Sequence, residues 1–284
     1  MKKIYLTILI LVAGLIGCQK NEKIEEKRPE KITQTSLSNM ANDESLDFVK
    51  DRLMDAIGEN DQAKADVEKF IDLVKDYNKS VGEENLIGDF DPNINQIYEV
   101  GKFIANRERA DKKYPDTNCR INTFLLAKDI MKVQKSSNDV DDSMLFMDEE
   151  KLEAGNIFDE ETLEKFKTFF ARIPTVESKD PADHGKVMEE YFKSWSFPEN
   201  AHLLSIVIND VLDGNFLFIG HIGLLIEIDG GYLFVEKISF EEPYQAIKFP
   251  DKISCYDYLR EKFENYTDPE TAPPFLMDNG KFVE

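Results

Sequence analysis

Apolar residues recur at helical spacing through the first part of the chain. In residues 43–58 they stand three or four positions apart, as at Leu46, Val49 and Leu53. This spacing gives a helix one apolar face that can be buried. The same criterion predicts helices over residues 43–58, 61–78, 93–110, 118–134, 159–173 and 183–195.

The pattern changes to alternation after Pro198, where β-branched and aromatic residues dominate and Gly and Asp separate the runs. The predicted strands are 203–210, 216–229, 231–240 and 244–249, and a last helix is predicted over 254–266. Helices followed by an antiparallel sheet predict an α+β fold. We therefore expect a single domain over residues 36–284, with a helical part at 36–198 and a sheet part at 199–284.

The first 35 residues differ from the rest. Two lysines precede an apolar run, residues 5–16, which is too short for a stable membrane span and ends just before Cys18. This ending resembles the lipobox of bacterial lipoproteins, with an ordinary signal peptide as the alternative. The resemblance implies a signal peptide at residues 1–17, a lipidated Cys18, and a protein held by acyl chains on the extracytoplasmic face of the cell membrane. Residues 18–35 are charged and nearly free of apolar side chains, which predicts a flexible tether.

The chain is strongly acidic, with a formal net charge of −21. Removal of residues 1–17 would take away two lysines and no acidic residue, leaving −23. Such a surface repels nucleic acid and other anionic polymers. No nucleic-acid partner is therefore expected.

The pair Asp229-Gly230 separates two predicted strands and is a strong signal for a two-residue hairpin turn. This turn fixes the register, and alternation then places His221 and Glu236 on one face of the hairpin as diagonal neighbours. A slip of one residue would move Glu236 to the other face.

Cys119 follows Asp116 and Thr117, either of which could cap a helix beginning at this point. The sulfur would then lie in the first helical turn, where free amides and the helix dipole stabilise a thiolate. If this helix end meets the hairpin, the residues form a nucleophile, a base and an orienting acid. The candidate site residues are Cys119 as nucleophile, His221 as base, Glu236 as orienting acid, and Asn118 and Asn122 as oxyanion donors.

The order of these residues resembles papain-like amidases and peptidases of the NlpC and CHAP type, in which a Cys at a helix start precedes a strand His. The segment HIGLLIE carries the histidine side of this resemblance, whereas TNCRIN differs from the cysteine surroundings common in those families. The resemblance implies a papain-like arrangement and thiol-dependent hydrolysis of amide bonds, with cell-wall peptide as a substrate class. The segments NCRINTF, HIGLLIE and LFVEKISFEEPYQAIKF together resemble an uncharacterised family of Gram-positive lipoproteins, domain of unknown function 4300.

Other interpretations of the same residues stay open. Cys119 could be a buried packing residue, or it could form a disulfide with Cys255. In that case the protein is a non-enzymatic envelope lipoprotein that binds a peptide, a wall fragment or a protein partner. No cofactor and no metal are expected, because the acidic stretch DFDPNIN lacks the glycine and glutamate of a calcium loop and His184 and His202 have no ligand at zinc spacing.

Overall fold

The computed structural model describes residues 31–58, 60–134 and 139–284. Its helices are α1 (Asp43–Ile57), α2 (Asp61–Val81), α3 (Val100–Arg109), α4 (Cys119–Ala127), α5 (Phe146–Gly155), α6 (Glu160–Phe170), α7 (Pro181–Phe192) and α8 (Lys252–Phe263), with short 3₁₀ turns η1 (Glu83–Asn85) and η2 (Ser143–Leu145). Its strands are β1 (Ser36–Ser38), β2 (Lys132–Val133), β3 (Ile173–Pro174), β4 (Trp195–Ser196), β5 (Ala201–Asp210), β6 (Phe216–Ile228), β7 (Gly231–Lys237), β8 (Tyr244–Phe249), β9 (Phe275–Asp278) and β10 (Lys281–Phe282). No helix in these described stretches is both long enough and apolar enough to cross a membrane.

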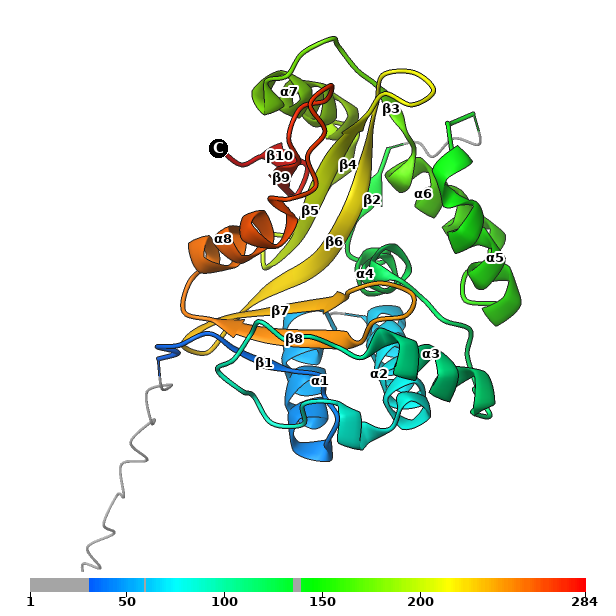
Figure 1. Ribbon diagram of the computed structural model, residues 1–284, viewed down its shortest axis with the longest axis vertical. Helices are drawn as coiled ribbons and strands as arrows, with labels where there is room; N and C mark the ends of the chain where they lie inside the picture. Colours follow the sequence, from blue (N-terminus) through cyan, green and yellow to red (C-terminus); the bar gives the residue numbers. More distant parts are fainter. Residues whose placement is uncertain (1–30, 59, 135–138) are drawn as a thin grey trace, which may run out of the picture.

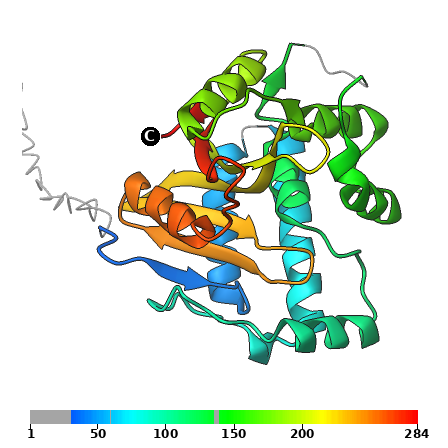
Figure 2. The ribbon, with the colours of Figure 1, turned by 45° about the horizontal axis from the view of Figure 1, so that its top comes forward.

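One antiparallel sheet organises the molecule. Its strand order is β1-β8-β7-β6-β5-β9-β10, and β3 pairs with the start of β6. Figures 1 and 2 show α1 and α2 on one side of this sheet and α8 on the other. The α+β prediction is therefore confirmed.

The sheet is apolar on both faces, so the strands bury two separate cores. On one face Leu224 and Val235 join a large core with α1, α2 and α4. On the other face Leu225 and Phe234 pack with Leu259 of α8. Alternation along β6 and β7 thus decides which core each side chain enters.

The order of elements along the chain is more mixed than the predicted helical part followed by a sheet part. Ser36–Ser38 already forms a strand, β1, which pairs with β8 at the edge of the main sheet. Helix α8 in turn lies in the C-terminal part. The helices are therefore not all N-terminal, and the sheet gathers strands from both ends of the described chain.

Two predicted helices are much shorter than expected. The helix predicted over residues 118–134 ends at Ala127, and Lys132–Val133 forms the strand β2, which pairs with β4. Residues 93–110 were predicted to be helical throughout, but α3 begins only at Val100. The preceding segment runs alongside β1, where Leu37 and Asp91 exchange backbone hydrogen bonds of 2.8 Å. The Tyr98 hydroxyl accepts a hydrogen bond from the side chain of Asn39 at 2.9 Å. Tertiary contacts thus hold residues before α3 in an extended path.

Candidate functional site

The predicted hairpin register is confirmed. Ile228 pairs with Gly231 around the turn, and the ladder continues to Leu224 opposite Val235. His221 and Glu236 lie on the same face, where His221 Nε2 and Glu236 Oε2 are 2.5 Å apart. The two side chains are 3% and 0% exposed, so this contact is shielded from water.

A β-bulge sets the face on which His221 lies. In the pairing of β5 with β6, Ile206 stands opposite His221 and Val207 opposite Ile219, so Gly220 is the extra residue. A Cβ on Gly220 would lie 2.3 Å from Ile208 Cδ1, which explains why glycine occupies this position. Without the extra residue, His221 would share the face of Ile219; with it, His221 turns toward α8.

The start of α4 meets β6 where β7 has separated from it. Beyond Leu224, the backbone of Ile222 no longer has a partner in β7. Helix α4 takes that place, because Thr123 Oγ1 donates to the Ile222 carbonyl at 3.2 Å and the Ile222 amide donates to the Cys119 sulfur. The thiol at the helix start therefore reaches His221 through the gap between the two strands.

The surroundings of Cys119 favour a thiolate. Burial by itself raises the pKa of this thiol, which is 5% exposed, and the imidazole of His221 is the strongest influence in the opposite direction. The charge of Arg120 and the Ile222 amide act in the same direction, and the pKa lies below its ordinary value. The position in the first turn of α4 adds the favourable helix dipole.

His221 has matching electrostatics. Burial alone would lower its pKa, but the neighbouring Cys119 sulfur and the Glu236 carboxylate raise the pKa of His221 to about 9. Because Nε2 contacts Glu236, the other ring nitrogen, Nδ1, is left for the thiol. The arrangement can therefore hold a thiolate beside an imidazolium at neutral pH.

Glu236 stays ionised although it is fully buried. Burial raises the pKa of its carboxyl, but the charges of Lys262 and His221 bring that pKa well below its usual range. Its Oε1 accepts from Tyr258 Oη and from Lys262 Nζ, both at 2.8 Å. The sequence did not predict these two contacts, because the spacing of residues in α8 does not indicate that this helix packs against the hairpin.

Helix α8 also covers the histidine. The Phe263 ring lies 5.1 Å from the His221 ring, and the two planes are tilted by 31°. Tyr258 and Lys262 stand four positions apart and share one side of α8, and Phe263 follows directly at the end of the helix. This side of the helix thus fixes both the imidazole and the carboxylate.

The amides of Asn118 and Asn122 have other partners. Asn118 caps α4 by accepting from the Ile121 amide at 3.0 Å, and its Nδ2 donates to Asp148 at 2.7 Å. Asn122 Nδ2 donates to the Asn118 carbonyl at 2.7 Å. These bonds hold the helix start in place, and both N–H groups of Asn122 are used, because Nδ2 also donates to Thr117 Oγ1 at 2.9 Å.

Asp148 of α5 connects this helix start to the rest of the fold. Its buried carboxylate accepts from Arg120 Nε at 3.0 Å and from Arg120 Nη2 at 2.7 Å, in addition to Asn118. Arg120 Nη1 reaches the Ile219 carbonyl at 3.4 Å. Neither Asp148 nor Arg120 could be assigned to the site from the sequence, because Asp148 stands in an acidic stretch for which no helix was predicted.

Both Cys119 and Cys255 are free thiols in the structure. Cys255 belongs to α8 and faces the core that this helix forms with the sheet. It is 0% exposed, and burial raises its pKa well above the ordinary value. Cys18 lies outside the described residues. Within those residues, no group of three or more His, Cys, Asp or Glu side chains is arranged to hold a metal ion.

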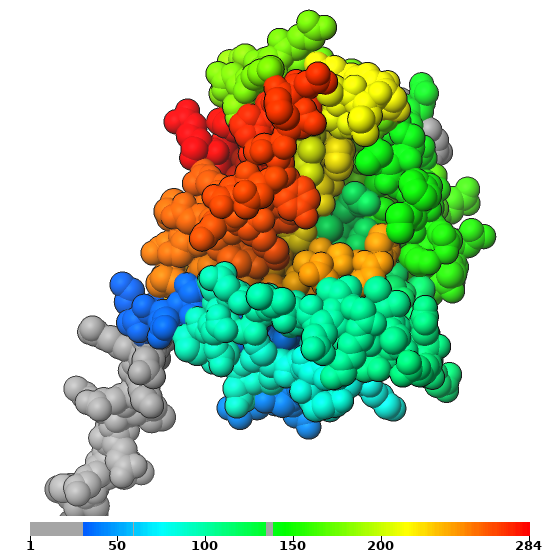
Figure 3. Space-filling model, in the orientation of Figure 1, coloured from blue at the N-terminus to red at the C-terminus, as the bar shows by residue number. Residues whose placement is uncertain are grey.

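The surface is hollowed over the site. Figure 3 shows atoms of β6 and α4 at the floor of a depression between α8, the β7–β8 connection and the α5–α6 region. His221 lies in β6 and Cys119 opens α4, so the hollow lies over the elements that carry both. Cys119 and His221 themselves are 5% and 2% exposed, so little of the thiol–imidazole pair is open to the surface.

Comparison with known proteins gives one match. A family model described as Domain of unknown function (DUF4300) matches residues 36–283. No curated protein and no solved structure matches the chain.

Proposed function

The chain belongs to the DUF4300 family, and we propose that its Cys119, His221 and Glu236 hydrolyse an amide bond by thiol catalysis. The supporting observation is the buried imidazole that contacts a carboxylate through Nε2 and a helix-start thiol on its other side. Nucleophile, base and orienting acid in this order are the arrangement of papain-like hydrolases, to which the sequence has its resemblance.

In the first step the Cys119 thiolate attacks the carbonyl carbon of the amide. The His221 imidazolium then gives its proton to the leaving nitrogen, the C–N bond breaks, and a thioester remains on the sulfur. In the second step neutral His221 takes a proton from water, whose oxygen attacks the thioester carbon. The acid is released, and the thiolate and imidazolium are restored.

The backbone at the start of α4 is the donor that we assign to the oxyanion. The first amides of a helix have no partner within the helix, and they point out of its N-terminus toward the sulfur. The side chains of Asn118 and Asn122 are engaged with protein acceptors, so their role is to hold this turn. Arg120 adds positive charge beside the developing negative charge.

The setting that we propose for this reaction is the cell envelope. Cys18 would carry the acyl chains that bind the membrane, and the tether would hold the domain on the extracytoplasmic face. A peptide of the cell wall is then the accessible amide substrate. The net charge of −21 argues against nucleic acid as a partner.

A panel of fluorogenic peptide amides, each with an aminocoumarin leaving group, tests the reaction with the full-length protein. Hydrolysis should disappear in Cys119→Ala and in His221→Ala and persist in Cys255→Ala, the matched control for a buried free thiol. The rate should decline as pH rises through about 9, because His221 loses the proton that the leaving amine needs. Wild-type turnover by Cys119→Ala would refute the proposal.

The burial of the three side chains favours a second candidate, a non-enzymatic envelope protein that binds a peptide, wall fragment or protein partner in the same hollow. Counted as whole residues, backbone included, Cys119 is 5%, His221 2% and Glu236 1% exposed. A binding protein requires no reactive thiol. This candidate would be established if the wild-type protein binds a ligand but hydrolyses no peptide of the panel.

A further inference from the structure

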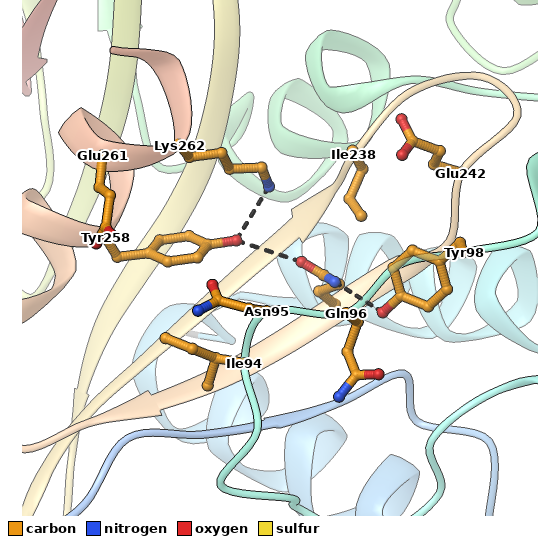
Figure 4. Close-up of a pocket in the computed structure, with 10 residues that line it drawn as sticks. Ile94, Asn95, Gln96, Tyr98, Ile238, Glu242, Tyr258, Glu261 and Lys262 are labelled. Carbon is orange, nitrogen blue, oxygen red and sulfur yellow. Dashed lines mark hydrogen bonds between the residues drawn. The ribbon is translucent and has the colours of Figure 1, made fainter. Parts of the chain in front are cut away.

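A pocket of about 280 Å³ lies on the far side of Glu236 from His221. Tyr258 and Lys262 line it and both contact Glu236 Oε1, so the pocket borders the site directly. Figure 4 shows these two side chains on one side of the pocket and Tyr98 on the other. The volume is close to the lower end of small-ligand sites, which suits one amino-acid residue of a longer ligand.

The pocket carries a buried amide with unused hydrogen-bonding capacity. Gln245 is 3% exposed, and its Nε2 donates to the Tyr98 hydroxyl at 2.8 Å. A primary amide has two N–H donors and an acceptor oxygen. Its Oε1 is only weakly engaged, by Tyr258 Oη at 3.4 Å. Such a group recognises another amide, as in a peptide backbone.

The charges around the pocket favour a cation. Lys262 is neutralised by Glu236, which its Nζ contacts at 2.8 Å. Glu242 and Glu261 also line the pocket, and neither forms an ion pair within 4.0 Å with any residue that the structure describes. The pocket therefore has an excess of negative charge beside a group that binds amides.

On the basis of the proposed hydrolase, we infer that this pocket binds an ammonium-bearing residue of the peptide substrate. Glu242 and Glu261, which lie on opposite sides of the pocket in Figure 4, attract the ammonium group by their combined charge, Gln245 binds the adjoining peptide amide, and Ile94 and Ile238 contact the aliphatic part. The ammonium group belongs either to a lysine-like side chain or to the peptide's own N-terminus, and both sources present the same chemistry.

Binding to the full-length Cys119→Ala protein tests the pocket without turnover. The probes are Gly-Lys-Gly, its N-terminally acetylated form, and the form acetylated on both amines, followed by saturation-transfer NMR. We expect the doubly acetylated peptide to bind about tenfold more weakly than Gly-Lys-Gly. The affinity of the singly acetylated peptide then shows which of the two amines the pocket binds. Equal affinity of all three peptides, or no binding of any, would overturn the inference.

Variants locate the binding. Glu242→Gln and Glu261→Gln should each weaken binding of Gly-Lys-Gly about two- to fivefold, since partly exposed ion pairs contribute modestly. Glu264→Gln, which removes a carboxylate from the end of α8 outside the pocket, is the matched control and should change nothing. Unchanged binding in the double variant Glu242→Gln/Glu261→Gln would refute the assignment of these residues.

The pocket and the reaction can fail separately. Amine-dependent binding without hydrolysis of any peptide by the wild-type protein would refute the proposed hydrolase and support the pocket. Hydrolysis with an unchanged KM in the double variant would support the hydrolase and refute the pocket.

Discussion

Replacing His221 by alanine isolates the interaction on which the site depends. The pKa of Cys119 is affected first by burial, which raises it, and then by His221, Arg120 and the Ile222 amide, which lower it. Removal of the imidazole takes away the strongest of the lowering interactions. Burial then dominates, and we expect the thiol to become less acidic than an ordinary cysteine.

The size of the effect follows from the contact. An opposite charge at hydrogen-bonding distance changes a protonation equilibrium by about 10- to 1000-fold. A more basic thiolate is also a better nucleophile, with a Brønsted coefficient of about 0.4–0.5, so roughly half of the logarithmic change is recovered. Alkylation of Cys119 at about pH 6.5, well below the ordinary cysteine pKa of about 8.5, should slow about 3- to 30-fold in His221→Ala.

Iodoacetamide labelling of the folded full-length protein measures this rate, with mass spectrometry to separate the two cysteine peptides. Cys255 is an internal control, because its raised pKa and complete burial make it slow in both proteins. His202→Ala is a matched variant, since its Nδ1 contacts Asp278 at 2.8 Å in a second histidine–carboxylate pair. Labelling of Cys119 in that variant should equal the wild-type rate.

Three results would contradict the reasoning in different ways. Equal rates for Cys119 in the wild type and in His221→Ala would end the catalytic interpretation of the thiol. Slow labelling of Cys119 that does not respond to His221 would mark a buried packing cysteine. Labelling of neither Cys119 nor Cys255 before a reductant is added would indicate a disulfide in solution.

Other substitutions give further tests. Glu236→Gln should slow Cys119 labelling less than His221→Ala does, because the acid acts through the ring; a larger effect would contradict its orienting role. Asn118→Ala removes a helix cap and a donor to a buried carboxylate, so urea unfolding should show a loss of about 2–3 kcal/mol, against about 1 kcal/mol for the α2 cap variant Asn60→Ala. Equal losses of unfolding free energy in the two variants would mean that the hydrogen bond from Asn118 to Asp148 does not stabilise the fold. Cys18→Ala should leave an unprocessed precursor without fatty-acid label, and normal acylation and cleavage of that variant would refute the proposed anchor.

Local signals were sufficient where they agreed with the tertiary fold. Asn42 and Asn60 each cap a helix by accepting from a backbone amide at 2.9 Å, and the helices after them begin near the predicted residues. The turn at Asp229-Gly230 fixed the register of a long hairpin. Caps and two-residue turns are short-range features, so a single sequence contains all that determines them.

The missed short strands have two different origins. β1 has three residues, too few for alternation to be visible, and it forms because the distant strand β8 offers its edge. β10 has two residues and pairs with β9 across the two-residue turn Asn279-Gly280, a local signal that the strand prediction did not include. The three side chains of α8 at the site are placed by the packing of that helix on the sheet, and its sequence pattern shows only that it is amphipathic.

The contact between Cys119 and His221 rests on a departure from a regular sheet that the sequence pattern did not reveal. Helix α4 packs in the core that contains Ile222 and Leu224, whereas His221 shares the opposite face with Leu225. In a continuous β6–β7 ladder the sheet would lie between the thiol and the imidazole. The bulge at Gly220 puts His221 on the side of α8, away from the core that holds α4, and the end of the ladder at Leu224 lets the helix start reach past the backbone to it. Residue order along the chain could therefore suggest the three partners, but only the irregular backbone brings them together.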